Sequence, residues 1–286
     1  MIRMNRIVII GAGQMGRTLA ELININRNEI LAFGDNDEGK WTDSSTKPPV
    51  VSVEKAVSME PDTVFIGVLG EERTEALTRQ IKELGYSGEI RPLLDIYNLF
   101  DIRSRSIRLL ASQIIAAGVP GDVAELGVYK GDTARQLNEL FPDRQLYLFD
   151  TFEGFDERDV RTEQSLKVSG AQEKDFADTS VDAVLERLLH RDNAVVRKGY
   201  FSETARGLDD LKFAFVSLDA DLYEPTLAGL EYFYPRLEGG GAIVIHDYNN
   251  RRFAGVKLAV EEYEKKTGTL KKVPLADLHG SCVIVK

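Results

Sequence analysis

Residues 213–225 read FAFVSLDADLYEP, an apolar run that stops on Asp219 and Asp221. Residues 242–248 read AIVIHDY, a second apolar run that stops on His246 and Asp247. A segment of helical length and the sequence EGGG, predicted to be a turn, separate the two runs. In a parallel α/β sheet, the carboxyl ends of the strands face the ligand crevice. We therefore expect two adjacent strands to bring these side chains to one cation or one proton, which predicts a functional site.

A glycine-rich loop upstream is predicted to bind a cofactor beside that site. Residues 118–137 read as a short strand ending on Glu125, a turn containing Gly127, Tyr129 and Gly131, and a helix that begins near Asp132. The glycine spacing is wider than in a dinucleotide fingerprint. It suits S-adenosylmethionine, because glycine lets the backbone approach the methionine moiety and Glu125 can meet an ammonium or sulfonium group.

The next predicted strand supplies a second contact to the same cofactor. Gln145–Phe149 ends on Asp150, and the sequence continues with Thr151 and Phe152. A carboxylate at the end of the second strand is placed to accept hydrogen bonds from ribose hydroxyls, as in dinucleotide sites. We therefore expect Asp150, with Thr151 and Phe152 after it, to line the cofactor site.

The first hundred residues contain a separate glycine fingerprint. The apolar strand Arg6–Ile10 leads into GAGQMG, with Gly11, Gly13 and Gly16, and a helical pattern follows. Dinucleotide binding requires this strand–loop–helix context, since the amino terminus of the helix attracts a pyrophosphate. The half is therefore predicted to be a Rossmann-like domain.

The ligand of this first half stays open between three alternatives. Asp35 or Asp37, after the next apolar segment, is a candidate for binding the ribose of NAD(P) or of a nucleotide-sugar. The third alternative is a scaffold without a ligand. The chain has no Tyr-x-x-x-Lys pair, which argues against a short-chain dehydrogenase or a sugar epimerase. The half also lacks an evident acid–base pair to assist hydride transfer.

Length and composition indicate a globular protein with two domains. With 286 residues, 43% of them hydrophobic and 29% charged, the chain is long for one domain. The charged segment DIRSRSIR places the boundary near residue 100, which gives domains 1–100 and 101–286. A formal charge of −10 argues against nucleic acid and anionic membranes as partners. The only cysteine, Cys282, excludes an intrachain disulfide.

The remaining segments give coarser expectations. The apolar run Ile7–Ile10 is too short for a signal peptide and no apolar span has transmembrane length, so a cytoplasmic location is expected. Val50–Val53 is predicted to be a strand and Gly199–Thr204 a loop. Asp156–Asp175 has no clear apolar period, and is predicted to be a long loop or a lid with a short helix over the strand ends, or else a solvated surface insertion.

The second half resembles the macrocin O-methyltransferase family, whose members use S-adenosylmethionine to methylate sugar hydroxyls. The resemblance covers about residues 101–286. It is carried by GVPGD-x-x-E-x-GV-x-x-G at 118–131, DTFEGF at 150–155, LDADLYEPT at 218–226 and YPRL at 234–237. It implies a class I methyltransferase fold with a mostly parallel seven-stranded sheet, so the whole chain is expected to be α/β with two Rossmann-like domains.

The resemblance also implies a divalent cation, usually magnesium, with Asp219, His246 and Asp247 as its ligands. The family commonly has Asp-Asp where this chain has His246-Asp247. Because magnesium prefers oxygen ligands and imidazole suits transition metals, three alternatives remain. Asp219 and Asp247 hold magnesium with waters, a metal such as manganese is used, or metal binding has been lost.

The implied reaction is O-methylation of a sugar hydroxyl on a nucleotide-sugar, a glycan or a glycosylated natural product. Asp219 and His246 are the candidate bases. Asp221, Tyr223 and Glu224 either line the acceptor site or cap the following helix, and Pro225 stands where a family serine is common. The alternatives are an NAD(P)-dependent oxidoreductase and a binding protein without turnover. Homo-oligomer formation stays open.

Overall fold

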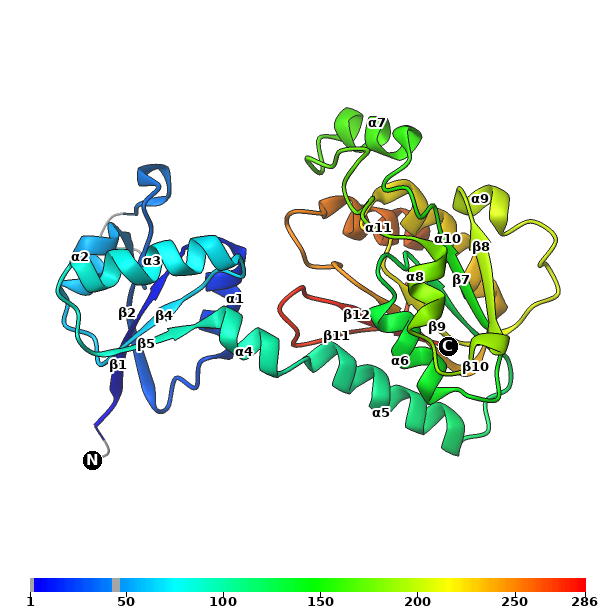
Figure 1. Cartoon of the computed structure of the whole chain (residues 1–286), viewed down its shortest axis with the longest axis horizontal. Coiled ribbons are helices and arrows are strands. Elements are labelled where there is room, and N and C mark those ends of the chain that lie inside the picture. Colours follow the sequence, from blue (N-terminus) through cyan, green and yellow to red (C-terminus); the bar gives the residue numbers. More distant parts are fainter. Residues whose placement is uncertain (1–2, 43–46) are drawn as a thin grey trace. The chain divides into compact units, whose positions relative to one another are not determined.

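The computed structural model describes residues 3–42 and 47–286. The chain divides into two compact units, Met1–Asp101 and Ile102–Lys286, both shown in Figure 1. This division falls next to residue 100, where the sequence places the boundary. Among the described residues, no helix is long and apolar enough to cross a membrane.

The first unit is built on a five-stranded parallel sheet with the order β3-β2-β1-β4-β5. This is the order of the first five strands of the doubly wound dinucleotide-binding fold. Val8, Ile10 and Ile66 are buried in its core. The strands are β1 (Asn5–Ile10), β2 (Asn28–Gly34), β3 (Val50–Val51), β4 (Thr63–Ile66) and β5 (Glu89–Pro92), and the helices are α1 (Gln14–Leu22), α2 (Val53–Val57), α3 (Glu71–Glu83) and α4 (Leu93–Leu99).

The second unit contains a seven-stranded sheet with the order β11-β12-β10-β9-β6-β7-β8. Only the pairings made by β12 are antiparallel, so the predicted mostly parallel seven-stranded sheet is confirmed. The strands are β6 (Asp122–Leu126), β7 (Leu146–Asp150), β8 (Ala194–Lys198), β9 (Phe213–Leu218), β10 (Leu237–Ile245), β11 (Lys272–Pro274) and β12 (Cys282–Val285).

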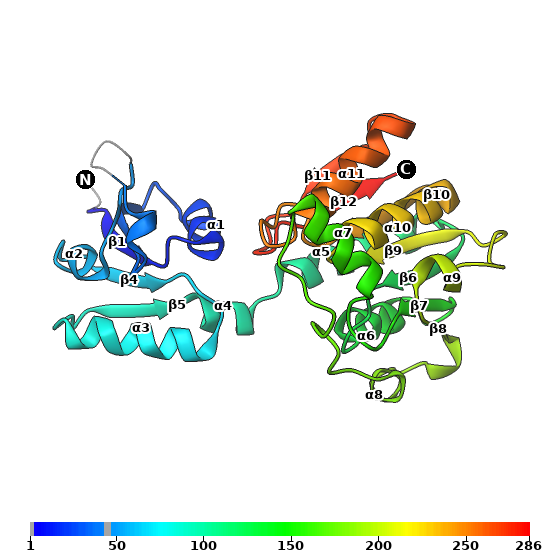
Figure 2. The ribbon, with the colours of Figure 1, turned by 90° about the horizontal axis from the view of Figure 1, so that it is seen from above.

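Helices cover both faces of this second sheet (Figure 2). The apolar side chains of α9, α10 and α11 form one core layer, and those of α5, α6 and α8 form the other. Strand β9 is buried along its whole length, which explains its continuous apolar sequence. The helices are α5 (Ile102–Ala116), α6 (Asp132–Leu140), α7 (Glu157–Leu166), α8 (Val181–Glu186), α9 (Phe201–Thr204), α10 (Tyr223–Arg236) and α11 (Ala254–Thr267).

Three local predictions are wrong. Val53 begins α2 instead of ending β3, because the Ser52 side chain accepts a hydrogen bond from the Lys55 N–H and caps the helix. The predicted loop Gly199–Thr204 contains the short helix α9. The EGGG sequence is no turn but lies inside β10, which pairs with β9 on both sides of it through a register shift.

The charged segment after β7 contains a regular helix, α7, of ten residues. The Asp156 side chain accepts a hydrogen bond from the Arg158 N–H and caps this helix. Its buried residues are Asp159, Val160 and Glu163. Since two of these three are acidic, the segment shows no apolar period although it has a buried face.

Candidate active site

The candidate site lies where β6, β9 and β10 end side by side. The Asp219 N–H donates to the Leu126 carbonyl oxygen at 2.8 Å, and the His246 N–H donates to the Leu218 carbonyl oxygen at 3.0 Å. These bonds extend the pairing of the three strands by one residue beyond the sheet. The ends of β6 and β9 approach so closely that a Cβ at Gly127, where φ is +85°, would lie 2.0 Å from the Asp219 carbonyl oxygen.

Asp219, His246 and Asp247 meet at these strand ends. The Nδ1 atom of His246 lies 2.8 Å from Asp219 Oδ1 and 2.8 Å from Asp247 Oδ2. This nitrogen is buried, yet neither contact has hydrogen-bond geometry. With Asp221, the three residues form a group whose candidate ligand atoms all lie within 4.8 Å of one another. The structure thus brings together all the predicted metal ligands.

The charges in this cluster depend strongly on one another. Burial opposes ionisation of Asp219, but the charges of His246 and Arg103 outweigh it and lower its pKa. Burial likewise opposes ionisation of Asp247, and its contacts with His246 and His279 hold its pKa well below the usual range. Asp221 shows the opposite result, since burial and the charges of Asp219 and Asp247 raise its pKa well above the usual range.

The two carboxylates beside His246 govern its pKa. Burial disfavours an imidazolium, but the carboxylates of Asp219 and Asp247 raise the pKa of His246 to about 10. The ionised carboxylates therefore surround a positive charge. A pocket that stabilises an imidazolium in this way is also one that attracts a metal cation.

Two residues of the site were missed in the sequence. Arg103, near the start of α5, places Nη1 2.7 Å from Asp219 Oδ2, although its segment reads only as a charged connection. His279, in the loop between β11 and β12, places Nδ1 3.7 Å from Asp247 Oδ1. The scarcity of histidine was the available signal, because the chain has only three.

The predicted cofactor loop, residues 127–131, is held in shape by hydrogen bonds to Asp150. One carboxylate oxygen accepts from the Val128 N–H at 2.6 Å and the Tyr129 N–H at 2.9 Å, and the other accepts from the Phe152 N–H at 2.6 Å. Thr151 turns back to donate to the Gly154 carbonyl oxygen at 2.6 Å. Asp150 therefore shapes the loop, and part of its accepting capacity remains for ribose hydroxyls.

Further loop residues differ in how they fit the prediction. Gly131 ends the loop at φ +78°, where a Cβ would lie 2.9 Å from Val184. The Tyr129 hydroxyl donates to Asp178 at 2.7 Å. Glu125 is only 1% exposed, and burial together with the charge of Asp219 raises its pKa well above the usual range. This burial does not support the expected direct contact between Glu125 and a charged cofactor group.

The start of α10 bears on whether Asp221, Tyr223 or Glu224 caps this helix. Leu222 is the residue before the helix, and it makes no side-chain capping bond. Instead, Glu163 of α7 accepts a hydrogen bond from the Tyr223 N–H at 2.7 Å. Asp221 belongs to the cluster, so the predicted capping role falls to a residue from another helix.

A family model described as macrocin-O-methyltransferase (TylF) matches residues 54–286. The chain belongs to the macrocin O-methyltransferase family. The resemblance seen in the sequence is confirmed, and the match begins in the first unit instead of near residue 101. Because the family and the relatives below are O-methyltransferases, the chain is an enzyme of this class. The family implies S-adenosylmethionine as the methyl donor.

Individual relatives are distant. The chain is 29% identical over 196 residues to the 8-demethyl-8-(2,3-dimethoxy-alpha-L-rhamnosyl)-tetracenomycin-C 4'-O-methyltransferase of Streptomyces olivaceus, covering 63% of this chain and 71% of the relative. It is 27% identical over 216 residues to the mycinamicin III 3''-O-methyltransferase of Micromonospora griseorubida, covering 70% and 82%.

Solved structures support the fold. The calicheamicin methyltransferase CalS11 superposes with a TM-score of 0.54 at 19% identity, covering 87% of this chain and 96% of that one. The O-methyltransferase NovP gives a TM-score of 0.52 at 22% identity, covering 64% and 79%. At these identities the likeness concerns the fold alone.

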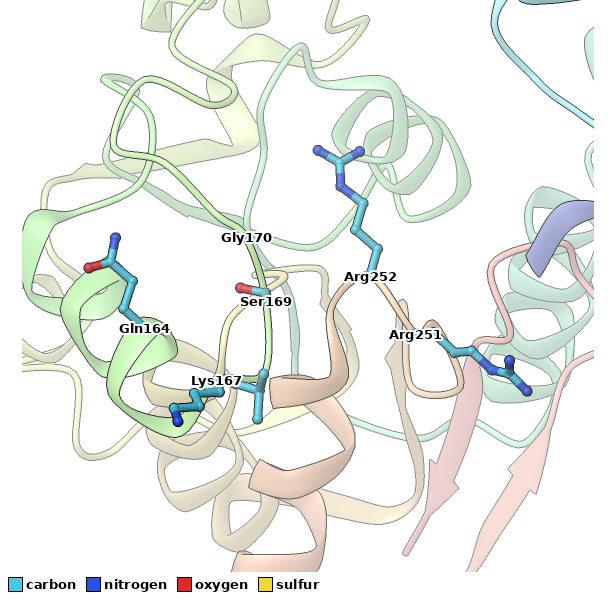
Figure 3. A pocket seen from close by; sticks show the side chains of 7 residues that line it. Gln164, Lys167, Ser169, Gly170, Arg251 and Arg252 are labelled. Carbon is cyan, nitrogen blue, oxygen red and sulfur yellow. The ribbon is translucent and has the colours of Figure 1, made fainter. Parts of the chain in front are cut away.

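This macrocin O-methyltransferase family member has a cavity of about 590 Å³ beside α7. Residues from the end of α7 and from the loop after β10 line it, as Figure 3 shows. Arg251 and Arg252 extend in different directions and do not converge on one point (Figure 3). The wall is connected to the cluster, because Asn250 donates to Asp247 and accepts from the Arg252 N–H.

The glycine fingerprint of the first unit has the packing that its spacing predicts. Gly11 has φ +104°, and a Cβ at Gly16 would lie 1.8 Å from the Gly11 carbonyl oxygen. A Cβ at Gly13 would meet open space. Asp35 accepts from the Ala12 N–H at 2.8 Å and pairs with Lys40 at 3.2 Å. The carboxylate predicted to bind a ribose is therefore engaged within the loop.

Asp37 has a local role in the first unit. Its side chain accepts a hydrogen bond from the Gly39 N–H at 3.0 Å and caps the short helix Glu38–Lys40. Asp35 is the more buried of the two acids, and backbone N–H donors from Asp37 and Ala12 overcome the effect of burial and lower its pKa. Both acids therefore have local partners in the first unit.

Proposed function

We propose that this enzyme transfers a methyl group from S-adenosylmethionine to a sugar hydroxyl of a small molecule, with assistance from a divalent cation. The observation that carries the proposal is the cluster of Asp219, His246 and Asp247. The cluster lies at the ends of β9 and β10, and β9 is the neighbour of β6, which the proposed cofactor loop follows. The relatives support the acceptor class, since one is named for a rhamnosyl compound. The sugar belongs to a nucleotide-sugar, a glycan or a glycosylated natural product.

The cluster fits a divalent cation. Asp219 and Asp247 offer carboxylate oxygens, and His246 offers a buried nitrogen that has no hydrogen bond of normal geometry. When bound, such a cation lowers the pKa of a coordinated hydroxyl. Magnesium and manganese are both candidates, because the donors include oxygen and nitrogen.

Asp219 is the residue that we assign as the base. Its side chain is 20% exposed, whereas that of Asp247 is 3% exposed, so Asp219 is the carboxylate that an acceptor hydroxyl can reach. His246 and Arg103 contact its two oxygens and hold its orientation. His246 is the alternative base. Methyl transfer is an in-line displacement, so the chain contributes largely by aligning the acceptor oxygen with the methyl carbon and sulfur.

The cavity beside α7 is the proposed acceptor site. Its volume of about 590 Å³ is in the range of small-molecule pockets. One residue links its wall to the cluster, because Asn250 donates to Asp247 and accepts from the Arg252 N–H. In this arrangement α7 acts as a cover that limits access of water to the strand ends.

A nucleotide-containing ligand, NAD(P) or a nucleotide-sugar, is a second proposal that concerns the first unit alone. The observation that favours it is the loop at Gly11–Gly16, where Gly11 and Gly16 pack closely and the backbone at Gly13 is open. These are the separate roles that glycines play in a dinucleotide fingerprint. The unit is then a binding module that serves the methyltransferase.

The experiment that tests the proposed function is Asp219→Asn. We expect methyl transfer to a sugar panel to fall by at least about a hundredfold, since a base and a proposed ligand are lost together. Binding of S-adenosylhomocysteine, measured by calorimetry, should stay within about threefold of the original, because the cofactor loop is untouched.

Asp209→Asn is the matched control. Asp209 is 77% exposed and pairs with Arg236 away from the strand ends, so this variant should keep full activity. Full activity in Asp219→Asn would exclude Asp219 as base and as required ligand. Loss of activity together with loss of S-adenosylhomocysteine binding would show that the substitution disturbs the cofactor site instead.

A further inference from the structure

The loop between β11 and β12 holds His279 in a defined place. Asp277 is buried and accepts from both the Ser281 N–H and the Ser281 hydroxyl at 2.7 Å. The Asn249 N–H donates to the Gly280 carbonyl oxygen at 3.0 Å and ties this loop to the one that follows β10. Gly280 has φ +69°, and a Cβ there would lie 2.7 Å from Asn249. The contact between the two loops therefore requires a glycine next to His279.

This loop brings a second imidazole to the cluster. The rings of His279 and His246 have centroids 4.9 Å apart and are tilted by 35°. His246, Asp247 and His279 form a group of possible metal ligands whose donor atoms lie within 4.8 Å of one another. It shares His246 and Asp247 with the group that contains Asp219 and Asp221. An ion held by either group would contact these two shared residues.

The donor types of the two groups differ in the metal they favour. Three carboxylates and one imidazole make a mixed site, whereas His246, Asp247 and His279 offer two nitrogens and one oxygen. Magnesium demands oxygen ligands and keeps most of its waters. Two imidazoles with one carboxylate are typical of iron(II), and imidazole also suits other transition metals such as zinc. The Nδ1 of His246 is buried and lies 2.8 Å from a carboxylate oxygen of Asp219 and 2.8 Å from one of Asp247, although neither contact has hydrogen-bond geometry, so a cation could take the place of a proton there.

We propose that His279 completes the metal site and makes it selective for a transition-metal ion over magnesium. The proposal rests on the metal-assisted function above and specifies the cation. His279 then acts as a metal ligand, and the loop that holds it determines which ion the site takes. Asp219 and Asp221 face the shared ligands from β9 and supply the charge that attracts the ion.

The test uses the full chain after treatment with EDTA, without methyl donor or acceptor. Calorimetric titration with manganese(II), cobalt(II) or magnesium(II) chloride should give at least about tenfold tighter binding of manganese and cobalt than of magnesium. Pulsed electron paramagnetic resonance of the manganese form should show nitrogen couplings from coordinated imidazole. His279→Ala should weaken manganese and cobalt binding by about tenfold or more, remove part of the nitrogen coupling, and change magnesium binding little.

His190→Ala is the matched control, because it removes the one remaining histidine of the chain. His190 bonds to Asn138 through its backbone, so this variant should keep its fold and its metal binding. His279→Asn tests whether a polar side chain that supports the loop without imidazole also loses selectivity. Melting curves of each variant separate loss of the ligand from unfolding.

The outcomes are distinguishable. Equal affinities for magnesium and manganese, or unchanged nitrogen coupling in a folded His279→Ala, would overturn the role of His279 and leave metal assistance intact. Full methyl transfer in the presence of EDTA would overturn the metal-assisted function itself. Selective binding that is lost in both His279 variants and kept in His190→Ala would support the proposal.

Discussion

Several residues at the site adopt a left-handed backbone, which side chains other than glycine rarely do. Tyr129, Phe152, Asp221 and Asp247 have φ between +48° and +59°. Each such residue costs on the order of 1 kcal/mol and persists only where surrounding contacts enforce it. Each lies two or three residues beyond the end of β6, β7, β9 or β10. Local backbone strain therefore occurs just beyond the carboxyl ends of the strands that form the candidate site.

Asp159 makes the stability of the protein depend on pH. Burial raises the pKa of Asp159 from 3.8 to about 6, although the Tyr200 hydroxyl donates a hydrogen bond to it. The folded chain therefore binds this proton more tightly than the unfolded chain between about pH 4 and pH 6. The free energy of unfolding should fall as the pH rises through this range, by up to about 3 kcal/mol from this group alone.

Asp159→Asn removes that titration. The original chain loses stability as this proton is released, and the variant does not. The free energy of unfolding of the variant minus that of the original chain should therefore rise by up to about 3 kcal/mol from pH 4 to pH 7. Urea denaturation at several pH values measures this difference, and other groups cancel in the comparison. A difference that stays constant across the range would contradict a raised pKa at Asp159.

At the scale of elements, the close approach of β6 and β9 positions the cofactor loop against the cluster. The Leu126–Asp219 backbone bond joins the two strand ends, and Gly127 is the residue that permits it. Helix α7 adds a second connection, because Glu163 caps α10 through the Tyr223 N–H. The elements around the site are thus joined by contacts that require particular residues, in addition to general packing.

Gly127→Ala should disturb this junction. Its Cβ would lie 2.0 Å from the Asp219 carbonyl oxygen at φ +85°, so backbone must move, and we expect a loss of at least about 3 kcal/mol in free energy of unfolding. Gly118→Ala is the control, with φ +61° and no atom within 4 Å, and should lose about 1–2 kcal/mol. Similar losses in thermal and urea unfolding of the two variants would disprove the steric argument.

At the scale of the whole molecule, each unit has its own sheet and its own buried core. The second unit contains the cluster of Asp219, His246 and Asp247, the loop proposed to bind the cofactor and the cavity proposed to bind the acceptor, whereas the first contains the glycine fingerprint. The family match spans both, because it begins at residue 54. We propose the methyltransferase chemistry for the second unit, and ligand binding by the first unit is a separate proposal.

Calorimetry on the full chain can separate the two proposed binding sites. Asp150→Ala should weaken S-adenosylhomocysteine binding by at least about tenfold. The reason is that the backbone N–H groups of Val128, Tyr129 and Phe152 lose the carboxylate that accepts their hydrogen bonds. Asp35→Ala should leave that binding unchanged and weaken any binding of NAD(H) or a nucleotide-sugar. If Asp35→Ala reduced S-adenosylhomocysteine binding as strongly as Asp150→Ala, the assignment of the methyl donor to the second unit would be wrong.

The apolar runs that end on acidic residues and histidine predicted the meeting of Asp219, His246 and Asp247, and the resemblance to the macrocin O-methyltransferase family implied the seven-stranded sheet. Buried parallel strands read as continuous apolar runs, and side chains at their carboxyl ends must face one edge. The segment that contains α7 is predicted from the sequence only as a long loop or as a lid with a short helix, because the buried face of α7 is largely acidic and shows no apolar period.

Only the tertiary structure placed Arg103 and His279 at the site. Arg103 is 116 residues from Asp219 along the chain, and His279 lies on a loop whose position depends on a contact with Asn249. No local pattern encodes such contacts, because they arise from how separate elements pack. Tertiary structure likewise decided that Glu125 is buried whereas the side chain of Asp219 stays partly exposed. Burial of this kind depends on neighbours distant in sequence.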